Sequence, residues 1–579
     1  MTDIPTTLAD RFGRAISSLF DVGGNATGVF LRPSTNERFG DYQLNVAMSL
    51  AKSLNQNPRQ IAEQITQAAD VDDLCEKIEI AGPGFINVTL KAEAISQQLD
   101  RIASDDRLGV RSSEHPDTVV VDYSSPNVAK QMHVGHLRST VIGDCICRVL
   151  DFAGHKVNRQ NHIGDWGTQF GMLIEYLDGV ERVDGQQIGD LEVVYREAKK
   201  HFDADPDFAE RARLRVVALQ ANDLETRETW QRIVDQSKSH FKATYSRLGV
   251  LLTDVDIRGE SFYNDQLPQL VELFDNAGLL VESNGAQCIF PEGFYDRDDK
   301  PLPLIVRKSD GGFPYAATDL AALWFRIKEL HADRIVYLVD TRQKQHFEMV
   351  FTALRSHPQW VKADVRLEHV MFGTVLGPDR KPFKTREGGT VKLDRLLEEA
   401  EHRAAEVIDQ KNPQLSVAER TKIAHAVGIG ALKYADLSSD RIKDYVFDWQ
   451  RMLALNGNTA PYLQNAYVRI RSIFRKAASQ DAHVGAAVQI SHPAERALGI
   501  KILQLPAVIE SVADSLEPHR LCTYLYDLAS LFHQFYEKCP VLGCNNESLQ
   551  TSRLVLCDIV ARTLKHGLNL LGIDVVERM

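Results

Sequence analysis

The chain has 579 residues, and at about 150 residues per domain this length predicts three or four domains. Apolar residues make up 44% and charged residues 25%, a balance typical of folded globular proteins that excludes disordered and collagen-like chains. Asp and Glu number 79 against 67 Lys and Arg, so the net charge of −12 excludes a protein that coats nucleic acid non-specifically.

The sequence gives no sign of a membrane span, a leader or a zinc centre. No apolar run approaches the roughly 18 residues of a membrane helix, and the first residues lack the basic-then-apolar pattern of a signal peptide. None of the eight cysteines forms a Cys-x-x-Cys pair, so we expect reduced, mostly buried thiols and no structural zinc. We therefore expect a cytoplasmic protein without a membrane partner.

The first stretch, residues 1–107, mixes helical and strand patterns. Apolar residues recur at helical spacing over 61–69, and residues 85–90 alternate apolar and polar side chains after a Gly-Pro-Gly turn, which predicts a strand. A polar, charged stretch from 104 to 116 follows and is typical of a linker. We therefore expect an α+β N-terminal domain.

Residues 116–395 alternate strand and helix patterns. Val119–Val121 is a short apolar run, as in a buried parallel strand, and apolar residues from Val134 to Leu150 keep a period of 3.6 until Gly154 closes the helix. A second buried strand is predicted over 334–339. This rhythm predicts an α/β Rossmann-like domain built on a parallel sheet.

Two further regions are predicted to be helical. The stretch from about 176 to 260 is charged and lacks strand signals, so we interpret it as an insertion into the Rossmann-like domain. Residues 396–579 carry apolar stripes at helical spacing, which predicts an all-α bundle at the C-terminal end.

Two histidines stand at the start of the helix that follows the first parallel strand. Ligands of open α/β sheets bind at the carboxyl ends of the strands, and His133 and His136, three residues apart, share a helix face there. The helix N-terminus, the small Gly135 and the charge of Lys130 together indicate a site for polyphosphate. A surface or metal-binding histidine pair is the alternative. A P-loop pattern is absent from the sequence, which excludes that type of ATP site.

The string His133-Val134-Gly135-His136 resembles the His-Ile-Gly-His motif of class I aminoacyl-tRNA synthetases. The longer string Ser124–Thr140 resembles arginyl-tRNA synthetases in particular. The likeness extends over nearly the whole chain, through the strings at 39–43, 81–87, 164–171, 457–462 and 576–579.

A second phosphate loop is implied by the resemblance. Class I synthetases carry a Lys-Met-Ser-Lys-Ser loop after the last sheet strand, and the matching loop here starts at Gly377. By likeness Phe383 takes the place of Met, Lys384 that of the first Ser and Thr385 that of the second Lys, so the usual phosphate cation is missing. Lys130 could supply the missing charge from the other side. The resemblance implies ATP contacts by Phe383, Lys384 and Arg386, although Lys384 and Arg386 would also fit a solvated charged loop.

An amino-acid pocket is predicted beside a later helix. A guanidinium is planar and always charged and pairs with a carboxylate in a two-pronged manner, so Asp319 suits an arginine side chain, with Tyr315 on the same wall. Alternatively, Asp319 only stabilises the N-terminus of its helix. The resemblance places the guanidinium of the substrate at this pair. It also implies that the amino group and carboxylate of the substrate are held by Asp122, Asn127, His133 and Gln343, although Gln343 would also fit an ordinary polar loop.

The helical end carries a local basic strip. Residues 449–480 contain no acidic residue but five basic ones. Gln464, Arg471 and Arg475 are predicted to share a face that, with Tyr462, could meet single-stranded bases and phosphates, or be an ordinary solvated face. The resemblance places anticodon recognition here, with the C-terminal Met579 close by, and sets the first 107 residues against the elbow of the tRNA.

The leading hypothesis is ATP-dependent arginylation of tRNA(Arg) by a ligase that forms an aminoacyl ester. By resemblance, Mg²⁺ accompanies ATP, activation requires bound tRNA, and neither DNA nor a membrane takes part; we expect a monomer. Another nucleotidyl transferase with a different acyl acceptor is disfavoured by the large helical end. An inactive RNA-binding paralogue is disfavoured by intact His133, His136, Lys130 and Asp319. The catalytic groups implied are His133, His136, Lys130 and Lys384.

Overall fold

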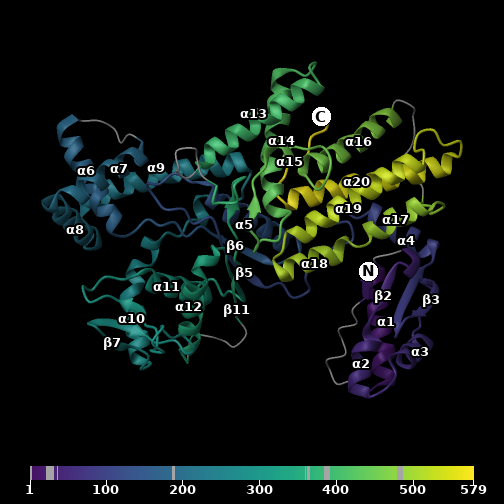
Figure 1. The fold of residues 1–579 in the computed structure, drawn as a ribbon, viewed down its shortest axis with the longest axis horizontal. Helices are drawn as coiled ribbons and strands as arrows, with labels where there is room; N and C mark the ends of the chain where they lie inside the picture. Colours follow the sequence, from purple (N-terminus) through teal and green to yellow (C-terminus); the bar gives the residue numbers. More distant parts are fainter. Residues whose placement is uncertain are drawn as a thin grey trace.

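The structure is a computed structural model that describes residues 3–20, 31–34, 37–184, 190–358, 360, 365–383, 391–478 and 487–579. In Figure 1 the helical insertion and the N-terminal domain lie on opposite sides of the molecule, and the C-terminal helices gather above the N-terminal domain. The helix α5 and the strands β5 and β6 lie at the centre, between these parts.

The N-terminal domain is α+β, as predicted. Its antiparallel sheet has the order β1-β2-β4-β3, and the predicted strand is β4. The inward side chains of the central strands are buried, among them Tyr42 and Leu44 opposite Val88 and Ile86. The elements are α1 (Ile4–Leu19), β1 (Leu31–Pro33), β2 (Tyr42–Leu44), α2 (Val46–Leu54), α3 (Pro58–Ala68), β3 (Cys75–Ala81), β4 (Phe85–Leu90) and α4 (Ala92–Ala103).

The predicted parallel sheet is confirmed, with the strand order β11-β10-β5-β6. Val119, Val120 and Val121 in β5 are fully buried because helices cover both faces of the sheet. The helix α5 ends at Phe152, and Gly154 follows with φ +94°, a conformation suited to glycine. The elements are β5 (Thr118–Asp122), α5 (Val134–Phe152), β6 (Lys156–Gln160), β10 (Arg334–Tyr337) and β11 (Arg366–His369).

The remaining elements of this region surround the sheet. The predicted helical insertion is made of α6 (Thr168–Asp184), α7 (Leu191–Ala204), α8 (Pro206–Gln220) and α9 (Leu224–Leu248). A small antiparallel sheet of order β7-β8-β9 follows, which the sequence did not predict. The other elements are η4 (Glu260–Gln266), α10 (Leu267–Asn276), β7 (Val281–Ser283), β8 (Ala286–Ile289), β9 (Leu304–Arg307), α11 (Tyr315–Lys328), η5 (Thr341–Gln343), α12 (Lys344–Ser356) and β12 (Val375–Leu376).

The C-terminal end is helical, as predicted. One short strand, β13, leaves the helices and pairs in parallel with β12, so the two regions are joined by backbone hydrogen bonds. The elements are α13 (Leu393–Lys411), α14 (Val417–Leu437), β13 (Tyr445–Val446), α15 (Trp449–Met452), α16 (Ala460–Ala478), α17 (Pro493–Ile502), α18 (Leu505–Ser515), α19 (His519–Lys538) and α20 (Glu547–Leu570). Within the described residues, no helix is both long enough and apolar enough to cross a bilayer. The predicted domain boundaries at 107, 116 and 395 stay predictions.

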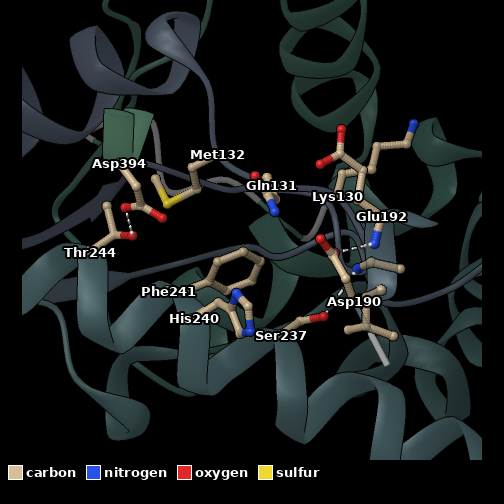
Figure 2. A pocket seen from close by; sticks show the side chains of 12 residues that line it. Lys130, Gln131, Met132, Asp190, Glu192, Ser237, His240, Phe241, Thr244 and Asp394 are labelled. Atoms are coloured by element: carbon tan, nitrogen blue, oxygen red, sulfur yellow. Dashed lines mark hydrogen bonds between the residues drawn. The ribbon is translucent and has the colours of Figure 1, made fainter. Parts of the chain in front are cut away.

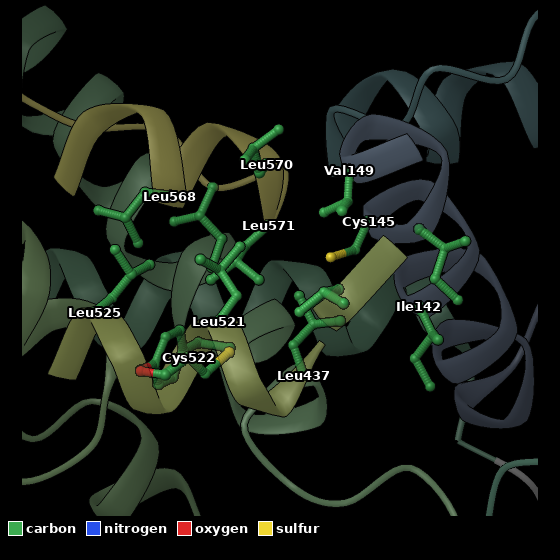
Figure 3. Packing of buried hydrophobic residues seen from close by; sticks show 14 of the residues in the cluster. Ile142, Cys145, Val149, Leu437, Leu521, Cys522, Leu525, Leu568, Leu570 and Leu571 are labelled. Atoms are coloured by element: carbon green, nitrogen blue, oxygen red, sulfur yellow. The ribbon is translucent and has the colours of Figure 1, made fainter. Parts of the chain in front are cut away.

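The helix α5 shares its hydrophobic core with the C-terminal helices. Ile142, Cys145 and Val149 point from α5 towards side chains of α14, α19 and α20 (Figure 3). Leu437 and Leu521 are among the buried side chains on the far side of this contact. The helix that begins at the predicted phosphate site is therefore packed along its length against the predicted RNA-binding bundle.

Candidate functional site

The loop between β5 and α5 has an unusual backbone. Ser124, Ser125 and Ala129 have φ of 72°, 45° and 62°, a left-handed region that residues other than glycine rarely adopt. Such conformations persist only where the surroundings hold them, and they gather at functional sites. Here Ser139 of α5 accepts a hydrogen bond from the N–H of Ser124 at 2.9 Å, and the hydroxyl of Tyr245 lies 2.8 Å from that of Ser124. The loop is therefore held in one shape by its neighbours.

The two histidines cap α5 and fix each other's orientation. His133 is the N-cap, and its N–H donates to Nδ1 of His136 at 3.1 Å, while the N–H of Gly135 donates to Nδ1 of His133 at 3.1 Å. A ring nitrogen that accepts a hydrogen bond carries no proton, so in the neutral rings the proton lies on Nε2. A Cβ on Gly135 would lie 2.9 Å from Cε1 of His133, so packing against this ring also requires glycine.

Both rings are neutral at pH 7. Burial lowers the pKa of His136 to about 3, and the charge of His133 adds to the effect. The pKa of His133 is lowered by burial and then by the charges of Arg342 and Lys130. The pair therefore offers two Nε2–H donors and, beside them, the N-terminus of α5, an arrangement suited to phosphate oxygens.

Lys130 is exposed and lies at the rim of a pocket on the insertion side of the loop. Its ammonium is 5.0 Å from the ring centre of Tyr195 on α7. Figure 2 shows Lys130 near Glu192, with Asp394 and Thr244 at the opposite end of the pocket. Glu192 forms an ion pair of 2.6 Å with Lys392, just before α13.

The second phosphate loop is described up to Phe383, and the predicted ATP contacts Lys384 and Arg386 lie outside the described residues. The ring of Phe383 stacks on Phe447, with centres 4.8 Å apart and an interplanar angle of 15°. The N–H of Phe383 donates to the carbonyl of Val375 at 3.0 Å. Beyond this loop, the N–H of Val134 donates to the carbonyl of Val391 at 3.0 Å, so the chain returns to the histidine site.

Asp319 lies in the second turn of α11, and its side chain is 16% exposed. One of its oxygens is 2.6 Å from Nε2 of His346 on α12. Burial alone would lower the pKa of His346, but the hydrogen bond and charge of Asp319 raise it above its usual value. Tyr315 opens the same helix and is 69% exposed, so it stands at the entrance rather than against the wall. Asp319 is thus held by one neighbour and keeps its second oxygen for another partner.

Two carboxylates that the sequence did not single out complete this region. Burial raises the pKa of Glu260 to about 8, and the charges of Asp165 and Asp319 add to it. The pKa of Tyr315 is raised by burial and then by the charge of Glu260, so Tyr315 lies within electrostatic range of that group. We name Asp165, Glu260, Tyr315 and Asp319 the acidic slot. A carboxyl group kept largely protonated by burial, with two further carboxylates near enough to add to the effect, suits a site for a cation.

Asp165 is fixed by the backbone around it. Its two oxygens accept hydrogen bonds from the N–H and the hydroxyl of Ser261, at 2.8 and 2.7 Å. A Cβ on Gly259 would lie 2.2 Å from Asp165, so only glycine permits this approach. The pattern Gly-Glu-Ser at 259–261 could have suggested a close backbone approach, but nothing in the sequence links it to Asp319.

The residues expected to contact substrate at the sheet edge differ in their exposure to solvent. Asp122 is buried, and its oxygens bond to Arg326 of α11 at 2.5 Å and to the hydroxyl of Ser125 at 2.9 Å. This gives Asp122 a part in fixing α11 to β5, which the sequence did not predict. Asn127 and Gln343 are exposed, as binding groups must be before substrate arrives. Their contacts with substrate stay predictions.

The predicted RNA face of α16 is only partly as expected. Gln464 is fully buried rather than on that face, and its amide donates to the carbonyls of Ala426 and Asp574 at 3.0 and 2.8 Å. Arg471 and Arg475 do point outward, but both bind Glu577, at 2.8 Å to its carboxylate and 3.0 Å to its carbonyl. The C-terminal tail covers the helix, which the sequence pattern of α16 alone could not reveal.

Tyr462 and Met579 pack against different neighbours. The ring of Tyr462 is 5.3 Å from that of His533 and 5.6 Å from that of Tyr526. Met579 packs against a small apolar cluster that contains Ala404 and Ile408. Both are partly exposed, and their contacts with tRNA stay predictions.

A basic pocket opens beside Tyr462. Arg469 lies 5.9 Å from the ring centre of Tyr536, and its guanidinium is 3.1 Å from Nδ1 of His533. We call this the basic pocket; its lining includes Arg469, Ser472, Lys476, Tyr536 and Leu542. An aromatic ring beside two cations suits a nucleobase and its phosphate. Tyr536 and His533 were not singled out in the sequence.

The parts of the chain that the structure describes hold no group of three His, Cys, Asp or Glu side chains that could bind a metal ion. The predicted absence of structural zinc concerns the whole chain and stays a prediction.

Comparison with known proteins gives matches along the whole chain. The family model described as the catalytic domain of class I tRNA synthetases (R) matches residues 98–449, the DALR anticodon binding domain matches 463–579, and the N-terminal domain of arginyl tRNA synthetase matches 6–90. The chain is 52% identical to an arginine–tRNA ligase of Cellvibrio japonicus over 95% of each chain, and 49% identical to one of Thermobifida fusca over 100% of each.

Two solved structures have the same fold over their full length. An arginyl-tRNA synthetase of Plasmodium falciparum superposes with a TM-score of 0.86 at 32% identity, covering 100% of both chains. The arginyl-tRNA synthetase of Thermus thermophilus gives a TM-score of 0.84 at 25% identity, again over 100% of both. The likeness therefore includes the arrangement of all the regions described above.

Proposed function

The chain belongs to the class I arginyl-tRNA synthetases, and on this premise we propose how its own residues carry arginine–tRNA ligase activity. The substrates are L-arginine, ATP with its Mg²⁺, and tRNA(Arg). The observation that carries the assignment of arginine is the acidic slot, in which the pKa of Glu260 is raised to about 8 beside Asp165 and Asp319. An empty slot of this kind gains most from a permanent cation, and a guanidinium never loses its charge.

The side chain of arginine enters the acidic slot. Asp319, held on one oxygen by His346, accepts from the guanidinium on its other oxygen, and Glu260 ionises as the cation arrives. Tyr315 closes the entrance, where its 69% exposure leaves it room to move. Lysine brings a single ammonium and citrulline no charge, so either leaves a carboxylate without a partner, and the slot rejects both.

ATP binds at the start of α5. The Nε2–H groups of His133 and His136 donate to phosphate oxygens, and Lys130 with the dipole of α5 supplies positive charge. Mg²⁺ enters with ATP as part of that substrate. By resemblance, Phe383, Lys384 and Arg386 also contact ATP. Asn127, Gln343 and His133 hold the amino and carboxylate groups of arginine, while Asp122 keeps α11 in position.

The reaction has two steps. A carboxylate oxygen of arginine attacks the α-phosphorus of ATP, a mixed anhydride bond forms, and the bond to the β-phosphate breaks to release pyrophosphate. A ribose hydroxyl at the 3′ end of tRNA(Arg) then attacks the carbonyl carbon, and AMP leaves as the ester forms. The hydroxyl proton passes to the departing phosphate or to water. No covalent enzyme intermediate is involved, and bound tRNA is required for the first step.

The tRNA is held by the C-terminal helices and the N-terminal domain. The basic pocket takes an anticodon base against Tyr536, with Arg469 and Lys476 on its phosphates, and Tyr462 stacks nearby. Arg471, Arg475 and Met579 contribute where the C-terminal tail meets the RNA. We leave Gln464 out of this contact because it is buried. The enzyme acts as a monomer in the cytoplasm.

The assignment is tested by ATP–pyrophosphate exchange with each of the twenty amino acids, with and without tRNA(Arg). Exchange should occur with arginine alone and only when tRNA is present. Exchange with lysine or glutamate in place of arginine would refute the role of the acidic slot. Exchange with arginine at full rate without tRNA would refute the tRNA requirement and leave the slot standing.

A further inference from the structure

A fully buried ion pair joins the catalytic helix to the RNA-binding bundle. Arg138 lies on α5, two residues after His136, and its Nε donates to Oδ1 of Asp436 on α14 at 2.9 Å. The two side chains are 1% and 0% exposed. The pair sits at the same contact between α5 and the bundle that buries the apolar side chains of Figure 3.

The same guanidinium reaches the chain that follows α14. Its Nη1 donates to the carbonyl of Lys443 at 3.1 Å, and it lies 5.3 Å from the ring centre of Tyr445 and 6.0 Å from that of Phe372. Tyr445 opens β13, whose pairing with β12 places Tyr445 opposite Val375. The strand β12 runs directly into the second phosphate loop.

We name residues 441–449 the junction segment, because they lie along the whole approach to that loop. The carbonyl of Arg441 accepts from the N–H of Gly373 at 2.9 Å, and the N–H of Phe447 donates to the carbonyl of Leu376 at 2.8 Å. Asp444 accepts from the N–H of Thr374 at 2.6 Å. The stacking of Phe383 on Phe447 extends this contact to the last described residue of the loop.

The ion pair is a poor source of stability. Removing two charges from water costs several kcal/mol each, and replacement of such pairs by apolar side chains is often neutral or stabilising. In addition, Nη2 of Arg138 is buried and has no hydrogen-bond partner among the residues that the structure describes. The pair instead fixes the orientation of the Arg138 guanidinium, because that group is held both by Asp436 and by the carbonyl of Lys443.

We propose that Arg138 and Asp436 are positioning residues for arginine activation. They fix the start of α5, with its two histidines, relative to the junction segment and the second phosphate loop. Neither residue touches a substrate. Because α14 and the junction segment lead into α15 and α16, the same pair ties the RNA-binding helices to the histidine site. This inference rests on the proposed roles of His133, His136 and the loop.

The test separates position from stability. In the double variant Arg138→Met/Asp436→Leu, no buried charge is left unpaired, so thermal unfolding should stay within a few degrees of the wild type. At saturating tRNA(Arg), ATP and arginine, kcat for ATP–pyrophosphate exchange should fall at least about tenfold, since small displacements of reacting groups have large costs. The Kd for tRNA(Arg), measured by filter binding, should change less than about twofold.

The control is an equally buried pair inside the bundle. Arg553 and Glu495 are 2.8 Å apart, with side chains 9% and 0% exposed. Glu495 also caps α17, so Arg553→Met/Glu495→Leu should lose more stability than the test variant. Its kcat for exchange should nevertheless stay within about twofold of the wild type, because the pair does not touch α5 or the junction segment.

Each outcome decides something. A folded Arg138→Met/Asp436→Leu variant with the kcat of the wild type would overturn the proposal, and so would an equal loss of kcat in the control. A loss of tRNA affinity with kcat preserved would assign the pair to RNA binding and also overturn it. If the wild type itself showed no exchange with arginine, the proposed function would fail instead, which the same assay reports separately.

Discussion

If arginine binds the acidic slot as proposed, the raised pKa of Glu260 should make the affinity for arginine depend on pH. Burial and the charges of Asp165 and Asp319 raise this pKa to about 8, so at pH 7 only about one molecule in eleven carries an ionised Glu260 in the empty slot. A guanidinium favours the ionised form. Binding at pH 7 therefore releases nearly one proton, and the deprotonation costs about 1.4 kcal/mol for the one pH unit between 7 and 8.

The apparent Kd for arginine is the limiting Kd multiplied by 1 + 10 to the power (pKa − pH), so affinity increases as pH rises through 8. Between pH 6.5 and 8.5 this factor falls from about 33 to about 1.3, a gain of roughly 25-fold. The variant Glu260→Gln cannot ionise and should show a nearly flat profile, with any residual slope due to His346, whose pKa is raised by Asp319.

Isothermal titration with L-arginine, in two buffers of different ionisation enthalpy, measures both Kd and the protons released. The wild type should release about 0.9 proton at pH 7 and almost none at pH 9, while Glu260→Gln should release few at either pH. A wild-type Kd that is constant from pH 6.5 to 8.5, or a profile shared by the variant, would show that Glu260 does not meet the guanidinium.

Three further predictions concern single side chains. Asp319→Asn should raise KM for arginine at least about 100-fold with KM for ATP unchanged, because truncating a buried charge pair costs about 2–5 kcal/mol; exchange kinetics measure both. His136→Asn should lower kcat for exchange about 100-fold without changing tRNA affinity. Burial lowers the pKa of His136 to about 3, so between about pH 3 and pH 6.5 only the unfolded chain takes up a proton on this ring. In urea unfolding, the free energy of unfolding of the wild type should therefore fall with decreasing pH by up to about 1.4 kcal/mol per pH unit more than that of the variant. Gln464→Leu should lower the free energy of unfolding by about 1–3 kcal/mol, because the carbonyls of Ala426 and Asp574 lose their donor; urea unfolding detects this, and an unchanged midpoint would contradict it.

The parts of the site that the sequence predicted are those carried by one continuous segment. The apolar run at 119–121 and the 3.6 period after Val134 placed His133 and His136 at the end of a strand and the start of a helix, as the structure has them. This works because strand burial and helix periodicity are local, and the N-terminus of any helix favours anions.

The acidic slot was found only in part because it comes from three separate segments. Asp319 was proposed from the chemistry of a guanidinium, whereas Glu260 begins a short 3₁₀ helix with no periodic pattern. Its importance follows from a pKa that depends on Asp165 and Asp319, which are distant in sequence. Only the folded chain brings these charges together, and the glycine at 259 that permits it is one of many glycines.

At the helical end, the sequence predicted an exposed side chain that is buried in the structure. The amide of Gln464 was expected on a solvated face because its neighbours at helical spacing are arginines. The last residues of the chain cover that face, and their free carbonyls need donors, so a buried amide and two arginines serve the C-terminal tail instead. Periodicity identifies the faces of a helix, but it does not tell which segment covers each face.

Because His133 and His136 are both neutral, a positive charge at the phosphate site must come from another side chain. With the pKa of His136 near 3 and that of His133 also lowered, the rings can donate hydrogen bonds to a phosphate but add no positive charge. The charge that develops on the phosphate oxygens must then be met by a cation, and the matching loop has Thr385 where the family motif of this superfamily has lysine. Lys130 lies in the loop between β5 and α5, three residues before His133. Among the described residues its ammonium pairs with no carboxylate and lies only near the ring of Tyr195. A cation held by so weak a contact can turn to ATP at little cost, and the proposed role of Lys130 would make the degenerate second loop compatible with activation.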